Sequence, residues 1–266
     1  MSDFFDSDVG LARHASLRSP LTFLKDQMFD ARLAASSRFR SLKSGVSARY
    51  KVLIVGVEVP ARAGRLAEIT ARMSRSAHEV DVSILRMKPQ GKFANVDEAI
   101  AAAPRPLQDY DWLVVTDDDV AVGRTFLDDY LALAGAAELD ISQPAHRFAS
   151  YASYDITRRR YGSLVRSSRF IEIGPITVLA SRTLPELIPF PASRWCYGID
   201  LLWSAISGRN GWRMGVVDGA PVRHLSPVAR TYDKTEAFAE GKRLLEQFDV
   251  KLSRAEVLRT ETLIPA

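Results

Sequence analysis

Three consecutive aspartates follow a short apolar run near the middle of the chain. Asp117, Asp118 and Asp119 come directly after Trp112–Val115, whose β-branched residues predict a buried strand. Carboxylates this close together repel one another and cost free energy to desolvate. Mn²⁺ or Mg²⁺ would neutralise them, because both ions prefer hard oxygen ligands. The alternative is a solvated turn, or a helix N-cap before Thr125–Ala137, and the sequence leaves both interpretations open.

A further carboxylate and a histidine lie downstream. Gly198 allows a tight turn before a predicted helix, and Asp200 falls in the first turn of that helix, where the N-terminus favours an ionised carboxylate. The alternative is that Asp200 only caps the helix. His224 follows a short strand through a predicted loop, and a neutral imidazole suits Mn²⁺ beside carboxylates. A lone histidine is more often structural.

The elements that must position these residues follow from hydrophobic periodicity. Strands are predicted at Lys51–Val59, Val80–Met87, Trp112–Thr116, Leu139–Gln143, Phe170–Leu179 and Met214–Val217. Helices are predicted at Arg65–Ser74, Val96–Ala102, Phe126–Ala137, Gly198–Ser207 and Lys234–Phe248. The alternation in the first half predicts an α/β fold, Rossmann-like, with a mixed, mostly parallel sheet flanked by helices. Ligands of such sheets bind at the carboxyl ends of the strands, where the three aspartates lie.

The chain divides into three expected parts. Residues 1–49 form an N-terminal extension, helical or partly disordered; residues 50–250 form the main domain; residues 251–266 form a C-terminal tail. Within the extension, Leu21–Ala35 fits a loosely amphipathic helix, followed by arginines and a lysine. That helix would either touch a membrane surface or a partner, or pack on the domain. Arg147–Ser168 is polar and is expected to be a long excursion.

Composition limits the function classes. The chain has 266 residues, with 47% hydrophobic and 26% charged, which is ordinary for a water-soluble domain. Its net charge of +4 suits phosphate-bearing ligands but is too small to indicate nucleic acid. The single cysteine, Cys196, excludes a disulfide within one chain. No apolar run approaches the roughly 20 residues of a membrane span, and no signal peptide is recognisable. We expect a cytoplasmic protein, with at most peripheral contact at the inner face of the membrane.

Several sequence blocks, in one order, resemble a known group of enzymes. The blocks are YDWLVVTDDD (110–119), LDISQP (139–144), DITR (155–158), FIEIGP (170–175), YGID (197–200) and GVVD (215–218), followed by His224. They resemble glycosyltransferases of the GT-A fold, which carry a DxD motif after a strand, and more narrowly the DUF707 family of predicted glycosyltransferases. The chain departs from that family at Cys196–Gly198, where a tryptophan between two glycines is usual, so the shape of the acceptor pocket stays open.

The resemblance implies an activity and roles for residues. It implies transfer of a hexose from a nucleotide-sugar donor to an acceptor hydroxyl, with Mn²⁺ or Mg²⁺ as cofactor, in glycan or polysaccharide biosynthesis. Asp200 would be the catalytic base, and the metal ligands would be Asp117, Asp119 and His224. Donor-binding residues would be Gly56, Val57, Glu58, Arg86, Asp118, Arg230 and Lys234, and acceptor-binding residues would be Trp195, Tyr197 and Glu172. Glu172, inside an apolar stretch, would orient the acceptor or pair with an arginine.

Rival functions remain for comparison. A phosphohydrolase would need a hydroxyl residue two positions after its DxD, where this chain has Ala121. A nucleotidyltransferase acting on a sugar phosphate would need a glycine-rich phosphate loop, and Val59–Arg65 is a poor version of one. A non-catalytic sugar-nucleotide-binding protein is the third alternative. The acceptor would be a glycan or a lipid-linked molecule; no nucleic-acid partner is expected, and the oligomeric state is open. All assignments require that Asp119 and His224 converge in the fold.

Overall fold

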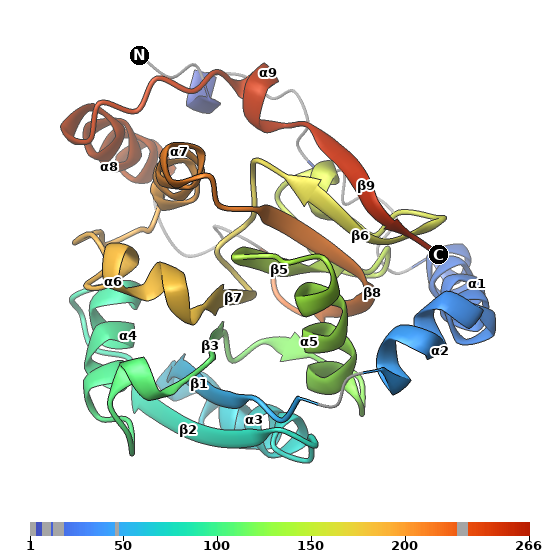
Figure 1. Ribbon diagram of the computed structural model, residues 1–266. Coiled ribbons are helices and arrows are strands. Elements are labelled where there is room, and N and C mark those ends of the chain that lie inside the picture. The colour runs from blue at the N-terminus through green and yellow to red at the C-terminus, as the bar shows by residue number, and fades with distance from the viewer. Residues whose placement is uncertain (1–3, 7–11, 13–18, 46–47, 228–233) are drawn as a thin grey trace.

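The computed structural model describes residues 4–6, 12, 19–45, 48–227 and 234–266. Within these residues, nine strands form one sheet in the order β2-β1-β3-β7-β5-β8-β6-β9, with β4 paired to β8 (Figure 1). The strands are β1 (Lys51–Glu58), β2 (Glu79–Arg86), β3 (Trp112–Thr116), β4 (Val120–Ala121), β5 (Ile141–His146), β6 (Ser163–Ser168), β7 (Ile176–Ala180), β8 (Met214–His224) and β9 (Thr260–Pro265). The helices are α1 (Pro20–Ala35), α2 (Ser37–Ser44), α3 (Arg65–Met73), α4 (Lys92–Ala101), α5 (Phe126–Ala136), α6 (Leu184–Leu187), α7 (Ile199–Asn210), α8 (Lys234–Gln247) and α9 (Arg254–Val257).

The sheet is mixed, and its two halves are built differently. Strands β2, β1 and β3 are parallel and agree with the predicted strands to within one residue at each end. Gly56 of β1 is opposite Thr116 of β3, so the carboxyl ends of these strands lie side by side. Strand β7 enters antiparallel between β3 and β5, and β6 and β9 extend the far edge antiparallel. The α/β class is confirmed, with its parallel part concentrated in β2-β1-β3 and β5-β8.

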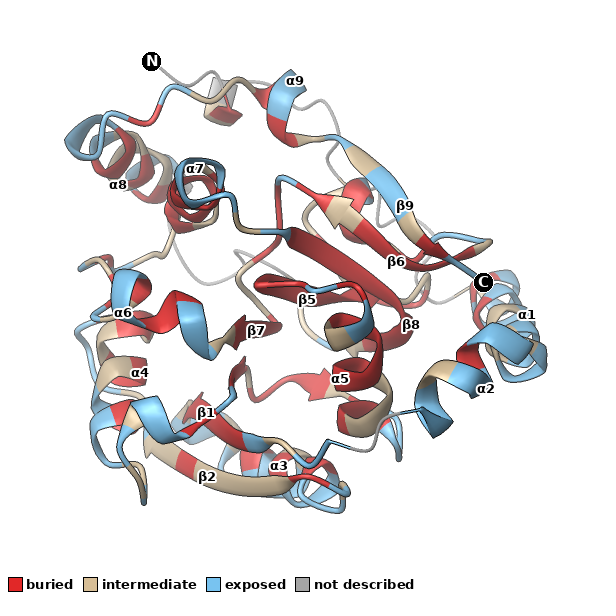
Figure 2. Ribbon diagram, viewed as in Figure 1, coloured by how far each residue is buried: buried red, intermediate tan, exposed pale blue. Residues whose placement is uncertain are grey.

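Helices cover both faces of the sheet. In β1, Leu53, Val55 and Val57 enter one apolar cluster while Val52 and Ile54 enter the other, because alternate side chains of a strand point to opposite faces. Burial on both faces explains the continuous apolar sequence of β1. Helices α4, α6 and α7 cover the first face, and α2, α3 and α5 contribute to the second (Figure 2).

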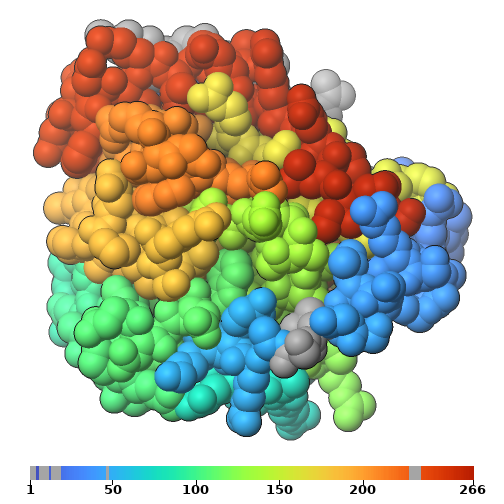
Figure 3. Space-filling model, in the orientation of Figure 1, coloured from blue at the N-terminus to red at the C-terminus, as the bar shows by residue number. Residues whose placement is uncertain are grey.

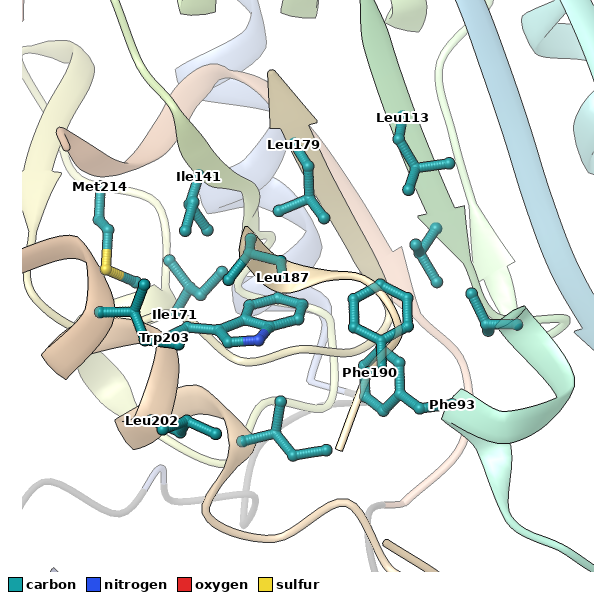
Figure 4. Close-up of a cluster of buried hydrophobic side chains, with 14 of the residues drawn as sticks. Phe93, Leu113, Ile141, Ile171, Leu179, Leu187, Phe190, Leu202, Trp203 and Met214 are labelled. Atoms are coloured by element: carbon teal, nitrogen blue, oxygen red, sulfur yellow. The ribbon is translucent and has the colours of Figure 1, made fainter. Parts of the chain in front are cut away.

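An aromatic group holds α4 and α7 together over the first face. The Phe93 and Phe190 rings lie 4.6 Å apart, and the Trp203 ring of α7 lies 5.7 Å from Phe190. Leu187 and Ile171 lie around Trp203 in the same cluster (Figure 4). Fixing α7 in this way also fixes its N-terminus, which carries Asp200.

The second half departs from the predicted elements. Strand β6 lies inside the expected polar excursion, where no strand is predicted. It carries Arg166, whose side chain is fully buried. That burial is possible because Arg166 pairs with Asp218 of β8 at 2.8 Å. The predicted strand at Phe170–Leu179 is shorter and begins at Ile176, and β8 continues to His224 instead of ending at Val217. Residues 251–266 include β9, which is hydrogen-bonded to β6 as the edge strand.

The N-terminal segments also contact the main domain. Phe4 is 1% exposed, and its ring stacks on Phe170 at 5.2 Å. The predicted helix at Leu21–Ala35 is confirmed as α1. No helix in the described part of the chain has both the length and the apolar content to cross a membrane.

Candidate active site

Strand pairing brings Asp119 and His224 together. The short strand β4 follows the three aspartates and runs antiparallel to the end of β8, with Val120 opposite His224. The N–H of Leu225 donates to the carbonyl oxygen of Asp119 at 2.8 Å, and Asp119 Oδ1 lies 3.2 Å from His224 Nε2. The predicted convergence is confirmed. The prediction that a loop carries His224 is wrong, because β8 extends to this residue.

The two side chains stabilise each other in their charged forms. Burial alone would raise the pKa of Asp119, but the hydrogen bond and the charge of His224, with help from Ser226 and Arg62, lower it to about 2. Burial alone would lower the pKa of His224, and the hydrogen bond and charge of Asp119 outweigh burial and raise it. The contact therefore favours the ionised form of Asp119 and the protonated form of His224.

Cations of the chain itself already neutralise the three aspartates. Lys92 Nζ lies 2.6 Å from Asp117 Oδ1, and Arg62 Nη1 lies 2.7 Å from Asp118 Oδ1. Arg62 Nη2 also reaches Asp119 Oδ2 at 3.4 Å. Sequence reasoning missed both cations, because they come from different elements: Lys92 begins α4, and Arg62 lies between β1 and α3.

Asp117 faces a different side from Asp119. Its backbone N–H donates to the carbonyl of Pro175 at 2.8 Å, which binds the end of β3 to the 170–175 block. A Cβ added at Gly174 would lie 2.8 Å from Asp117 Oδ2, so only glycine leaves room for this carboxylate. Lys92 Nζ also donates to the carbonyl of Ile173 at 3.3 Å. Asp117 is thus bound to Lys92 and to the turn that follows Glu172.

Two of the three expected metal ligands are placed to share one metal ion. Within the described ranges, no group of three or more histidine, cysteine, aspartate or glutamate side chains is placed to hold a metal ion. Asp119 and His224 have the ligand types that suit Mn²⁺ or Mg²⁺, and such ions commonly complete their coordination with phosphate oxygens and water. These two residues fit the expected metal. Asp117, the third expected ligand, contacts Lys92 instead.

The expected donor-binding residues at the end of β1 lie beside Asp118, but their polar groups have structural partners. Asp118 Oδ2 accepts the N–H of Val59 at 2.8 Å, and its other oxygen contacts Arg62. Glu58 accepts the N–H of Leu66 at 3.0 Å, at the start of α3.

The remaining predicted donor residues occupy varied positions. Gly56 packs against Leu66, Val57 belongs to the core, and Arg86 is exposed at the end of β2. Arg230 lies outside the described residues. Lys234 begins α8, and its side chain also lies outside the described part.

Glu172 is buried with a histidine rather than an arginine. Its carboxylate accepts the N–H groups of Ser153 at 2.9 Å and Tyr154 at 3.0 Å, and the hydroxyl of Thr157 at 2.5 Å. His146 Nε2 lies 3.6 Å from Glu172 Oε2. Burial would raise the pKa of Glu172, but His146 and these hydrogen bonds lower it to about 2. The expected arginine partner is therefore wrong, and His146 is a residue of this region that the sequence did not single out.

Asp200 has the opposite environment. Burial, together with the charge of Glu172, raises its pKa to about 7 against the opposing effect of backbone N–H groups including that of Leu201. The expectation that the helix N-terminus keeps Asp200 firmly ionised is wrong, because desolvation outweighs the N-terminal amides. A carboxylate that titrates near neutral pH matches the requirement for general base catalysis.

The loop before Asp200 is held by α8. Glu240 accepts the N–H of Trp195 at 3.2 Å and the hydroxyl of Ser193. Gly198 has a φ of +86°, and a Cβ there would lie 3.0 Å from the carbonyl oxygen of Gly241. Glycine is thus needed both for the backbone conformation and for the approach of α8.

The two expected acceptor platforms are aromatic residues with neighbours of their own. The Tyr197 ring contacts Phe238 edge-on at 5.2 Å and Phe5 at 6.2 Å, so this side chain belongs to an aromatic cluster. Arg194 lies over the Trp195 ring at 4.6 Å. Both residues are half-buried beside Asp200, as the sequence order requires.

The site residues are linked electrostatically across the second half of the sheet. The rings of His146 and His224 lie 6.3 Å apart, and Glu172 raises the pKa of both His224 and Asp200. Asp119, His224, His146 and Glu172 are thus successive neighbours, and the charge of Glu172 also acts on Asp200; the five residues together are called the titratable series. It connects the carboxyl end of β3 to the N-terminus of α7.

Comparison with solved structures finds similarity to S. aureus TarS. The TarS crystal structure aligns with a TM-score of 0.48 and 13% identity over 77% of this chain and 41% of that chain. Structures of TarS 1–349 align with UDP-GlcNAc bound (TM-score 0.47, 14% identity, 77% of this chain and 68% of that chain) and with UDP bound (0.45, 14%, 78% and 68%). This chain thus spans less than half the length of the TarS chain first compared. No family model and no curated protein matches the chain, so the resemblance to DUF707 stays a prediction.

Proposed function

We propose that this protein is a divalent-metal-dependent glycosyltransferase that moves a sugar from a nucleotide-sugar donor to an acceptor hydroxyl. The observation that carries the proposal is the contact between Asp119 and His224. The two residues are more than a hundred positions apart in the sequence. Their meeting at the carboxyl end of β3, beside the end of β1, puts metal-ligand chemistry where α/β sheets bind nucleotides.

Asp119 and His224 would hold the metal, Mn²⁺ or Mg²⁺. When bound, the ion supplies positive charge that stabilises the departing nucleoside diphosphate. His224 would bind the metal as a neutral imidazole, a form that Asp119 disfavours by raising the pKa of His224, and Asp119 would give up its contact with Arg62. Arg62 and Lys92 stand at the same edge as cations, and both are placed to contact phosphate oxygens once the aspartates change partners.

Asp200 would accept the proton of the acceptor hydroxyl. Its pKa of about 7 leaves it partly deprotonated at neutral pH and still basic enough to take a proton in the transition state. With Asp200 as base and the diphosphate leaving from the opposite side, the expected outcome is inversion at the anomeric carbon. Glu172 supports this role through its charge rather than by touching the acceptor, because its oxygens are engaged with Ser153, Tyr154 and Thr157.

A donor panel tests the proposal. Nucleotide sugars are incubated with Mn²⁺, and free nucleoside diphosphate and pyrophosphate are measured together. Release of nucleoside diphosphate from one donor, abolished by a chelator and by Asp119→Asn, supports the transferase. Release of pyrophosphate from a nucleoside triphosphate and a sugar phosphate would identify a nucleotidyltransferase instead. Binding without any release would identify a sugar-nucleotide-binding protein.

A further inference from the structure

Helix α1 is attached to the domain by its polar side. Asp26 is 3% exposed, and its carboxylate accepts the N–H groups of Phe148 at 3.0 Å and Ala149 at 2.9 Å. The guanidinium of the buried Arg159 lies 2.9 Å from Asp30 and 3.5 Å from Asp26. These contacts fix the rotation of α1 about its axis, because two carboxylates one turn apart must both face the domain.

The opposite side of α1 is apolar and exposed. Leu21, Leu24 and Met28 are 69%, 51% and 63% exposed, and their spacing of three and four residues makes one stripe along the helix. Phe23, which is 39% exposed, lies on the same side of the helix as Asp26 and Asp30 and is not part of the stripe. Four of the seven large hydrophobic side chains exposed in the described part of the chain are therefore on this one helix. An ordinary surface helix has the reverse arrangement, so the stripe indicates an external partner.

The charges around the stripe indicate the chemistry of that partner. Five cations lie on α1 and α2, and four of them are well exposed: Lys25, Arg32, Arg38 and Arg40. The two acids of these helices, Asp26 and Asp30, both contact Arg159 on the domain side. Apolar residues bordered by lysine and arginine, without an outward acid, complement the headgroups and the acyl boundary of an anionic lipid bilayer.

The domain side of α1 lies next to the end of β8. The guanidinium of Arg223 lies 5.0 Å from the Phe23 ring, and Arg223 immediately precedes His224. Leu225, on the other side of His224, is 37% exposed. Helices α1 and α2 form the right-hand edge of the molecule beside β8 (Figures 1 and 3). The contact between Arg223 and Phe23 holds the inner side of α1 against the domain and leaves the stripe facing outward.

We propose that the exposed face of α1 docks the protein on an anionic bilayer surface. Leu21, Leu24 and Met28 enter the interfacial region, while Lys25 and Arg32 contact lipid phosphates. The proposal concerns attachment alone and stands whether or not the proposed reaction is correct.

Vesicle co-sedimentation of the full chain tests this attachment. Vesicles of phosphatidylcholine containing one third phosphatidylglycerol are compared with pure phosphatidylcholine at physiological salt. We expect binding to the anionic vesicles, weak binding to the neutral ones, and loss of about tenfold or more of the partition coefficient in the variant Leu21→Ser/Leu24→Ser/Met28→Ser. Because these side chains are exposed, the variant should keep its circular dichroism spectrum and melting temperature.

A matched control and the oligomeric state complete the test. Phe248→Ser removes a side chain that is 39% exposed just after α8, and should leave vesicle binding unchanged. Binding that the triple variant retains would overturn the proposal. So would the absence of vesicle binding together with a dimer, seen by light scattering, that the triple variant dissociates, because the stripe would then be an interface between two copies of the chain.

Discussion

Two carboxylates of the titratable series, Asp119 and Asp200, have pKa values displaced in opposite directions although burial raises the pKa of both. Asp119 has a histidine and an arginine against its oxygens, and its pKa falls to about 2. Asp200 has backbone amides of its own helix but no cation among its pKa determinants, and Glu172 stands nearby, so its pKa rises to about 7. Burial acts on both groups in the same direction, and the partners decide the outcome.

The difference separates two chemical tasks. A carboxylate that stays ionised at every physiological pH can bind a cation, whereas one that titrates near neutrality can exchange a proton. The fold produces the contrast by placing Asp119 at a strand pair that ends in His224, and Asp200 in the first turn of α7, where its carboxylate accepts the N–H of Leu201. The following predictions test whether the two tasks are in fact divided in this way.

Asp200→Asn should have the largest effect. Loss of the base is expected to reduce the rate of sugar transfer by about 10²–10⁴-fold, while the affinity for donor and Mn²⁺ stays within about twofold. Transfer is measured by nucleoside diphosphate release with acceptor present, and affinity by calorimetry. The control is Asp249→Asn, an exposed aspartate far along the chain. Equal turnover in the Asp200 and Asp249 variants would leave Asp200 with a capping role alone.

Asp119→Asn should affect binding first. It removes a charged metal ligand and leaves His224 without its partner, so Mn²⁺-dependent binding of nucleoside diphosphate should weaken by about 10–100-fold. Asp117→Asn is the informative comparison, because Asp117 contacts Lys92. A weaker effect at Asp117 supports the two-residue metal site, whereas equal losses would restore Asp117 as a ligand. Thermal shift with and without Mn²⁺ measures both.

Asp200→Asn should also stabilise the fold above neutral pH. The native pKa of about 7 exceeds the ordinary value of 3.8, so the folded state holds this proton more tightly than the unfolded state. The favourable contribution is complete below the ordinary pKa and is lost as pH rises through the native pKa. Asparagine cannot ionise, so the variant should gain about 4 kcal/mol in the free energy of unfolding at pH 8 and well under about 1 kcal/mol at pH 4. Urea denaturation at both pH values measures the difference.

The sequence predicted the first half of the fold better than the second. Strands β1 and β3 are buried on both faces, so an apolar run identifies them without any knowledge of the partner. Strand β6 contains Arg166, whose burial is tolerated only because Asp218 lies across on β8. A local pattern carries no information about such a distant partner, so the polar sequence by itself indicates a loop.

The same limit applies to the candidate site. The position of Asp119 at the end of a strand followed from the pattern, and its convergence with His224 followed from the order of motifs. The sequence did not predict that strand β8 extends to His224, because Asp218, Gly219 and Pro221 are residues typical of a loop. Lys92 and Arg62, which neutralise the aspartates, have no recognisable spacing from them in the sequence.

The smallest predicted effect is a pH shift that links Glu172 to Asp200. The transfer rate at saturating donor should fall about tenfold per pH unit below roughly pH 7, as Asp200 becomes protonated. Asp119 does not contribute to this fall in rate, because its pKa of about 2 keeps it ionised throughout this pH range. Glu172→Gln removes a negative charge that raises the pKa of Asp200. The pH at which the transfer rate begins to fall should therefore decrease by a fraction of a pH unit. The pH–rate profiles of the variant and the parent protein measure the shift.

A profile that moves to higher pH would mean that Glu172 acts on the reaction through His146, its other neighbour. The division of tasks between Asp119 and Asp200 would then have to be revised.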